Sequence, residues 1–105
     1  MSAYRSDALS VLGDPTRRSI FVCLSEHPRS VGELADELPV SRPAVSQHLK
    51  VLKAAGLVTE RAAGTRRIYR LNPAGVAAMR YQLDTFWQRA LSAYTEVVDD
   101  AEKEN

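Results

Sequence analysis

The segment Ser41-Arg-Pro-Ala-Val-Ser-Gln-His-Leu-Lys-Val-Leu-Lys-Ala-Ala55 decides how the rest of this chain is interpreted. Its apolar residues Val45, Leu49 and Leu52 are spaced i, i+4 and i+7, which places them on one face of an α-helix. Polar and basic side chains occupy the other face. The spacing therefore predicts an amphipathic helix with one face in the core and the other available for hydrogen bonds and charge.

A short helix with this polar face is suited to the major groove of DNA. There Arg pairs with guanine and Gln with adenine, while Ser and Lys reach phosphates or base edges. His48 lies near the core face, so we expect it to play a supporting role, either at a phosphate or half-buried and neutral. The candidate DNA contacts in this segment are Ser41, Arg42, Pro43, Ser46, Gln47, His48, Lys50 and Lys53.

The chain before this segment predicts a partner helix for it. Ser30 and Glu33 have the spacing of a capping box, which marks the start of a helix. Pro39 stops that helix, and Ser41 can cap the amphipathic helix that follows. Two short helices joined by about three residues form a helix-turn-helix. Further towards the N-terminus, Asp14-Pro15 is typical of a helix start, and a short helix is predicted within residues 1–12.

The chain after the segment predicts a β-hairpin. Two strand-like runs, 58–63 and 66–71, flank Gly64-Thr65, where glycine permits a tight turn. Arg66 and Arg67 lie beside that turn, and a hairpin laid along DNA would place them over a phosphate or into the minor groove. The alternative is an edge hairpin that its charges keep soluble and unpaired.

The last helix is predicted to begin at Pro73 and to carry apolar residues at helical spacing as far as Val98. This stripe is too long for a small domain to cover, so it favours a two-fold interface with a second copy. The alternative use of this aromatic face is an effector pocket. We expect the chain beyond Asp99 to fray. The candidate interface residues of this helix are Leu83, Phe86, Trp87, Ala90, Leu91 and Tyr94.

Length and composition predict one domain over residues 1–105. The apolar and charged fractions, 45% and 26%, are those of an ordinary soluble protein, and no run of ~18 apolar residues could span a bilayer. We therefore expect a cytoplasmic protein with no membrane partner. The single cysteine, Cys23, excludes an intrachain disulfide and a cysteine-rich zinc site within one chain.

Charge is distributed unevenly although the net charge is only +1. Residues 41–70 contain seven basic side chains against one acid, Glu60, whereas the remaining segments contain seven basic and twelve acidic side chains. A basic section of +6 in a nearly neutral chain is typical of a nucleic-acid binder, whose affinity falls with salt as counterions are released from phosphates. A solvated charged face would have the same composition.

Five blocks in this order resemble the ArsR/SmtB family of bacterial winged-helix repressors. The resemblance implies a mainly α-helical winged helix-turn-helix with a small β-hairpin, in the order four helices, two strands and one helix, forming a homodimer. It also implies that 1–12 and 73–98 dimerise, with Leu9 and Leu12 in the interface, and that 30–71 binds an imperfect inverted repeat, often in the regulator's own promoter. The blocks are Leu12-Gly-Asp-Pro-Thr-Arg-Arg18, Val31-Gly-Glu-Leu-Ala35, Ser41 to Lys53, Ala55-Gly-Leu-Val58 and Gly64 to Leu71.

The chain departs from the metal-sensing members of that family. Such members carry a cysteine pair in the helix where this chain has Glu33-Leu-Ala-Asp-Glu-Leu38, or Asp and His ligands along the last helix, where this chain has no histidine. Carboxylates such as Asp36 and Asp84, without nitrogen or sulfur partners, suit hard cations held loosely. We therefore predict no metal site and no cofactor.

The sequence predicts a sequence-specific DNA-binding transcriptional regulator, a repressor that binds its operator as a homodimer without a metal. Neither a Gly-rich phosphate loop after a strand nor a nucleophile constellation indicates an enzyme. Two alternatives stay open: a protein-interaction module built on a winged helix, and a repressor that responds to a metal or a small molecule. The effector and the operator are not identified by the residues.

Overall fold

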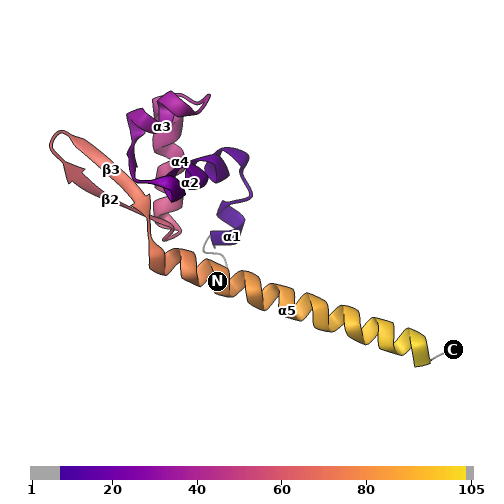
Figure 1. The fold of residues 1–105 in the computed structure, drawn as a ribbon. Coiled ribbons are helices and arrows are strands. Elements are labelled where there is room, and N and C mark those ends of the chain that lie inside the picture. The colour runs from indigo at the N-terminus through magenta and orange to yellow at the C-terminus, as the bar shows by residue number, and fades with distance from the viewer. Residues whose placement is uncertain (1–7, 104–105) are drawn as a thin grey trace.

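The computed structural model describes residues 8–103 and contains five helices and three strands among them. Figure 1 shows a compact head, formed by the helices and strands up to residue 71, from which one long helix extends. The elements are α1 (Ala8–Val11), α2 (Pro15–Glu26), β1 (Arg29–Ser30), α3 (Val31–Glu37), α4 (Arg42–Ala54), β2 (Val58–Ala63), β3 (Arg66–Leu71) and α5 (Pro73–Lys103).

Local capping fixes the helix starts in the head, as the sequence predicts. The Asp14 carboxylate accepts a hydrogen bond from the backbone N–H of Arg17 at the start of α2. Ser30 and Glu33 form the predicted capping box of α3, with both reciprocal hydrogen bonds present. The Ser41 hydroxyl accepts from the backbone N–H of residue 44 and caps α4. Each cap satisfies backbone donors that the first helical turn leaves without partners.

The predicted hairpin is present, but it belongs to a sheet of three strands. β2 and β3 pair antiparallel around Gly64, whose φ of 65° is the left-handed conformation expected at the turn. β1 adds to the other edge of β3, with Arg29 opposite Tyr69, so the strand order is β1-β3-β2. A strand of two residues carries no periodicity, and sequence patterns do not reveal it.

The core of the head combines residues from every layer and closes within the chain. Val45, Leu49 and Leu52 are at most 1% exposed, which confirms the stripe that defined α4. They pack with apolar side chains of α1, α2, α3 and β2. The other fully or nearly fully buried hydrophobic residues are Ala8, Val11, Ile20, Leu24, Leu34, Leu57 and Val58.

The two terminal helices differ from their predicted bounds. In the first, the structure describes helix only over Ala8–Val11, and the rest of the predicted segment, 1–7, lies outside the described residues. The last helix continues to Lys103, so the predicted fraying beyond Asp99 is wrong. At 31 residues α5 is about 46 Å long at 1.5 Å per residue. Elongation of a formed helix adds one backbone hydrogen bond per residue, which allows α5 to extend past Val98, where the predicted apolar stripe ends.

A glycine contact joins α5 to the head. A Cβ added to Gly75 would lie 1.8 Å from the carbonyl oxygen of Gly56, so no side chain fits at this crossing. The side-chain amide of Asn72 donates to the same Gly56 oxygen at 2.9 Å, and the Asn72 backbone N–H donates to the Leu57 carbonyl. These contacts fix where α5 leaves the head.

Candidate nucleic-acid interface

The polar face of α4 is open, as the spacing of its residues predicts. Arg42, Ser46, Gln47 and Lys50 are exposed, while Val45 and Leu49 on the opposite face are buried in the core. Pro43 occupies the first turn, where its missing N–H leaves no helical hydrogen bond unmade. The Arg42 guanidinium lies beside α3, with Nη2 3.0 Å from where a Cβ on Gly32 would be. The guanidinium at the first turn of α4 therefore lies next to Gly32 in the first turn of α3.

His48 faces α2 instead of the open side of α4. Its Nδ1 lies 3.5 Å from Nη1 of Arg17 and 3.9 Å from Oδ2 of Asp14, and its side chain is 23% exposed. Arg17 donates from Nε to the Val11 carbonyl at 2.8 Å. His48 thus contacts the start of α2, and through Arg17 it is linked to the end of α1.

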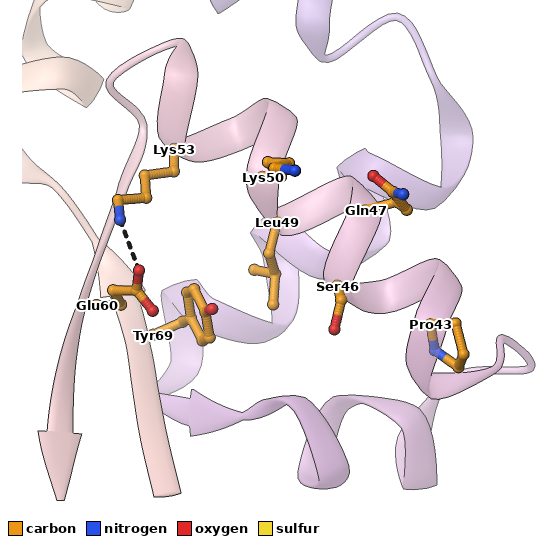
Figure 2. Close-up of a pocket in the computed structure, with 8 residues that line it drawn as sticks. All are labelled: Pro43, Ser46, Gln47, Leu49, Lys50, Lys53, Glu60 and Tyr69. Atoms are coloured by element: carbon orange, nitrogen blue, oxygen red, sulfur yellow. Dashed lines mark hydrogen bonds and ion pairs between the residues drawn. The ribbon is translucent and has the colours of Figure 1, made fainter.

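A groove separates α4 from the hairpin, and Glu60 of β2 lies in its wall (Figure 2). Lys53 from the last turn of α4 reaches across and places Nζ 2.5 Å from Oε1 of Glu60. The hydrogen bond from Lys53, followed by one from Tyr69, lowers the pKa of Glu60 below its ordinary value. Burial of the Tyr69 hydroxyl, together with its Glu60 neighbour, raises the pKa of the tyrosine.

The two arginines beside the turn are held by different elements, Arg66 by residues at the start of α3 and Arg67 by β2. Arg66 donates from Nη2 to Ser30 at 3.1 Å and to Glu33 at 3.0 Å, so it joins the β2–β3 hairpin, which is the wing of this fold, to the capping box of α3. Arg67 places Nη1 3.6 Å from Oε2 of Glu60. Their side chains stay 56% and 65% exposed, which leaves both guanidinium groups accessible to a phosphate.

The predicted basic residues therefore gather along one surface formed by α4, β3 and the groove between them, with the exception of His48. Sequence reasoning missed the two residues that organise this surface, Glu60 and Tyr69. Glu60 is the single acid among residues 41–70, and this isolation is the signal that could have identified it. Tyr69 faces the groove because side chains alternate along a strand, but the partner it would meet depends on how β2 and β3 pair.

Comparison with known proteins agrees with this geometry. Residues 12–61 match the family described as a helix-turn-helix domain. The HTH-type transcriptional regulator Rv2034 of Mycobacterium tuberculosis is 59% identical over 101 residues, covering 94% of each chain. The transcriptional repressor SmtB of the same species is 49% identical over 65 residues, which are 62% of this chain and 48% of that protein.

Solved structures share the fold as well. An ArsR-like transcriptional regulator from Rhodococcus sp. RHA1 superposes with a TM-score of 0.65 at 34% identity, covering 85% of this chain and 87% of that one. The chain belongs to the ArsR/SmtB family. It is accordingly a DNA-binding winged helix-turn-helix transcriptional regulator, and its relatives are regulators, not enzymes.

In this ArsR/SmtB regulator, the distal part of α5 exposes a row of large apolar side chains. Leu83, Phe86, Trp87, Leu91 and Tyr94 are between 40% and 68% exposed, and Ala90 between them is also exposed. The rings of Phe86 and Trp87 meet edge to face with their centroids 5.8 Å apart. By contrast, Leu9 and Leu12 at the other end of the predicted interface are half-buried, and Leu12 packs on the core of the head.

Potential metal ligands do not gather in the part of this ArsR/SmtB chain that the structure describes. Within residues 8–103, His, Cys, Asp and Glu side chains form no group of three that could hold an ion. Over the same residues, no helix combines the length and apolar character needed to cross a membrane.

Proposed function

We propose that this regulator is a cytoplasmic homodimeric repressor that binds an imperfect inverted repeat, including one in its own promoter, without a metal cofactor. The observation that carries the proposal is the open face of α4, which is bordered by basic side chains of the wing. In such a dimer, residues 30–71 of each copy bind one half-site, and residues 73–98 with the first helix bring the copies together.

The roles of the side chains follow from their positions on this surface. The exposed Arg42 and Gln47 lie on the part of α4 that would enter the major groove, where these residue types pair with guanine and adenine. Ser41 and Ser46 bind phosphates or base edges, and Lys50 and Lys53 neutralise the backbone. Arg66 and Arg67 bind phosphates from the wing. His48 supports the interface by holding α4 against α2.

Dimerisation is supported by the spacing of the exposed residues on α5. Leu83, Trp87, Ala90, Tyr94 and Val97 follow one another at alternating intervals of four and three residues. This is the heptad spacing of a helix that pairs with another helix. A monomer rarely exposes so continuous an apolar strip, and a second copy of the same helix, related by a two-fold axis, would cover it.

Base reading and backbone binding can be separated by two substitutions. We expect Gln47→Ala to cost about 1 to 3 kcal/mol of discrimination at one base position, because the adenine contact is lost. We expect Arg67→Ala to weaken binding to all sequences alike and to lower the salt slope by about one. Fluorescence anisotropy on operator and random duplexes at several salt concentrations measures both effects. Equal losses on both duplexes for both variants would contradict this division of roles.

The repeat in the operator gives a test of the dimer. Because both copies present α4 from one two-fold assembly, half-sites should lie about one helical turn apart, ~10 bp centre to centre. DNase footprinting on genomic DNA, including the region upstream of the regulator's own gene, measures that spacing. A single unpaired site would contradict a two-fold dimer.

A further inference from the structure

Glu60 places a negative charge beside the surface that is proposed to bind DNA. It is the single acid in the basic section of the sequence, and it stands in the wall of the groove beside the polar face of α4. DNA is a polyanion, so a carboxylate this close to the bound duplex opposes binding. The side chain is only 17% exposed, and it is held by its neighbours instead of extending into solvent.

Two cations from two elements converge on this carboxylate. Lys53 approaches Oε1 from the end of α4 at 2.5 Å, and Arg67 approaches Oε2 from β3 at 3.6 Å. Tyr69 lies directly opposite Glu60 in the β2–β3 register, and burial together with the Glu60 carboxylate raises the pKa of the tyrosine. Figure 2 shows Glu60 between Lys53 and Tyr69, facing the groove. Glu60 therefore connects the recognition helix to the wing through its side chain.

The same contacts restrain two of the cations that would otherwise bind any duplex. Non-specific affinity comes almost entirely from contacts between basic side chains and phosphates. A specific complex also requires α4 and the wing to hold a fixed relative geometry, so that base and phosphate contacts form together. A carboxylate that partly neutralises Lys53 and Arg67 weakens the non-specific complex. Because it also fixes the geometry of α4 and the wing, it favours the specific complex.

We propose that Glu60 is a specificity-determining positioning residue, which aligns Lys53 of α4 and Arg67 of the wing for the operator and reduces binding to unrelated DNA. This inference rests on the proposed DNA-binding role of the same surface. It gives an acidic residue a role in distinguishing the operator from unrelated DNA, in addition to the DNA contacts proposed for the basic residues.

The chain supplies a matched control in Glu33. Its carboxylate also holds a wing arginine, because Oε1 accepts from Arg66 at 3.0 Å, but it binds no residue of α4 and its side chain is 49% exposed. Glutamine preserves the capping box at this position, since its side chain can still reach the backbone N–H of Ser30. Glu33→Gln and Glu60→Gln therefore each remove one negative charge that holds a wing arginine, and only the second also removes the ion pair with Lys53 of α4.

The experiment compares the full-length wild type with these two variants on two probes. One probe is a duplex selected from random sequences by the wild-type protein, and the other is an unselected random duplex. For Glu60→Gln we expect binding to the random duplex to tighten by about fivefold, the upper range for a single ion pair at a protein surface, with no gain on the selected duplex. For Glu33→Gln we expect both affinities to change by the same factor, which leaves the ratio at the wild-type value.

A second measurement reports positioning without DNA. Amide hydrogen exchange of the β2–β3 hairpin should become faster in Glu60→Gln than in Glu33→Gln, because only Glu60 forms an ion pair between the hairpin and α4, whereas Glu33 pairs Arg66 with α3. The inference is overturned if Glu60→Gln tightens both duplexes equally, or if its hairpin exchanges as slowly as in the wild type. If the wild type itself does not distinguish the two duplexes, the proposed function fails, and the exchange measurement alone decides whether Glu60 positions the wing.

Discussion

Large apolar side chains are buried in the head but exposed along the distal half of α5. In the head, leucine and valine side chains from the four short helices and from the start of β2 are buried to within a few per cent. Along α5, no described residue is buried, and Trp87 and Leu91 are more than half exposed. Figure 1 shows the cause, because α5 leaves the head after its first turns and, among the described residues 8–103, meets no further helix or strand.

The head is stabilised by contacts within one chain, whereas the exposed apolar side chains of α5 can add stability only by contact with a partner chain. Burial of apolar surface drives folding wherever that surface is covered, whether the covering atoms belong to the same chain or to another. The head meets this condition alone. The exposed strip on α5 meets it only in an assembly, so its contribution should depend on protein concentration. Four experiments test this contrast, from the largest expected effect to the smallest.

Removing a core side chain should damage the head at any concentration. We expect Leu52→Ala to lower the free energy of unfolding by about 2 to 5 kcal/mol, because the residue is fully buried and leaves a cavity. Urea denaturation at two protein concentrations measures the change. The loss should be the same at both, and a loss that varies with concentration would mean that the head also relies on the partner.

Removing an aromatic side chain from α5 should instead weaken assembly. We expect Trp87→Ala to raise the dimer dissociation constant by about 30-fold or more, the effect of an interface hot spot worth about 2 kcal/mol. Analytical ultracentrifugation measures it. Tyr81→Ala is the matched control, because Tyr81 is 73% exposed but lies on the other side of the helix from Leu83 and Tyr94. Equal effects of the two substitutions would rule out a strip-specific interface.

Removing a cap tests how much of the head's stability is local. We expect Asp14→Ala to lower the free energy of unfolding by about 1 kcal/mol, because the backbone N–H of Arg17 loses its acceptor. Asp14→Asn should cost only a few tenths of that, since Asn caps a helix about as well. Thermal unfolding followed by circular dichroism measures both. An equally large loss for Asn would assign the effect to the charge, which also faces His48.

Acid should weaken the head through its paired carboxylates. Hydrogen bonds from the backbone of Arg17 and Ser30 and from the Lys53 ammonium lower the pKa of Asp14, Glu33 and Glu60 respectively. A carboxyl group whose pKa is lower in the folded state stabilises the fold above its unfolded pKa, about 4, and loses that contribution as the pH falls further. Urea midpoints should therefore be flat from pH 7 to 5 and decline below 4. A midpoint that rises on acidification would contradict this sign.

Much of the fold was readable from the sequence because its signals are local. The stripe Val45, Leu49 and Leu52 depends on helical period alone, and the capping box of Ser30 and Glu33 depends on residues three apart. The turn at Gly64 depends on one residue that tolerates a positive φ. The polar face of α4 follows directly from the stripe, so most of the candidate DNA contacts were predicted with it.

The tertiary structure alone decided the contacts between distant segments. β1 exists because Arg29 and Ser30 meet β3 nearly forty residues later in the sequence, and nothing in two residues predicts that pairing. The turning of His48 towards α2 and the convergence of Lys53 and Arg67 on Glu60 also require the packed elements. The sequence by itself determined which faces are polar and where helices start, because these depend on neighbours along the chain. Which charges meet across those faces depends on how the elements pack, and only the fold sets that.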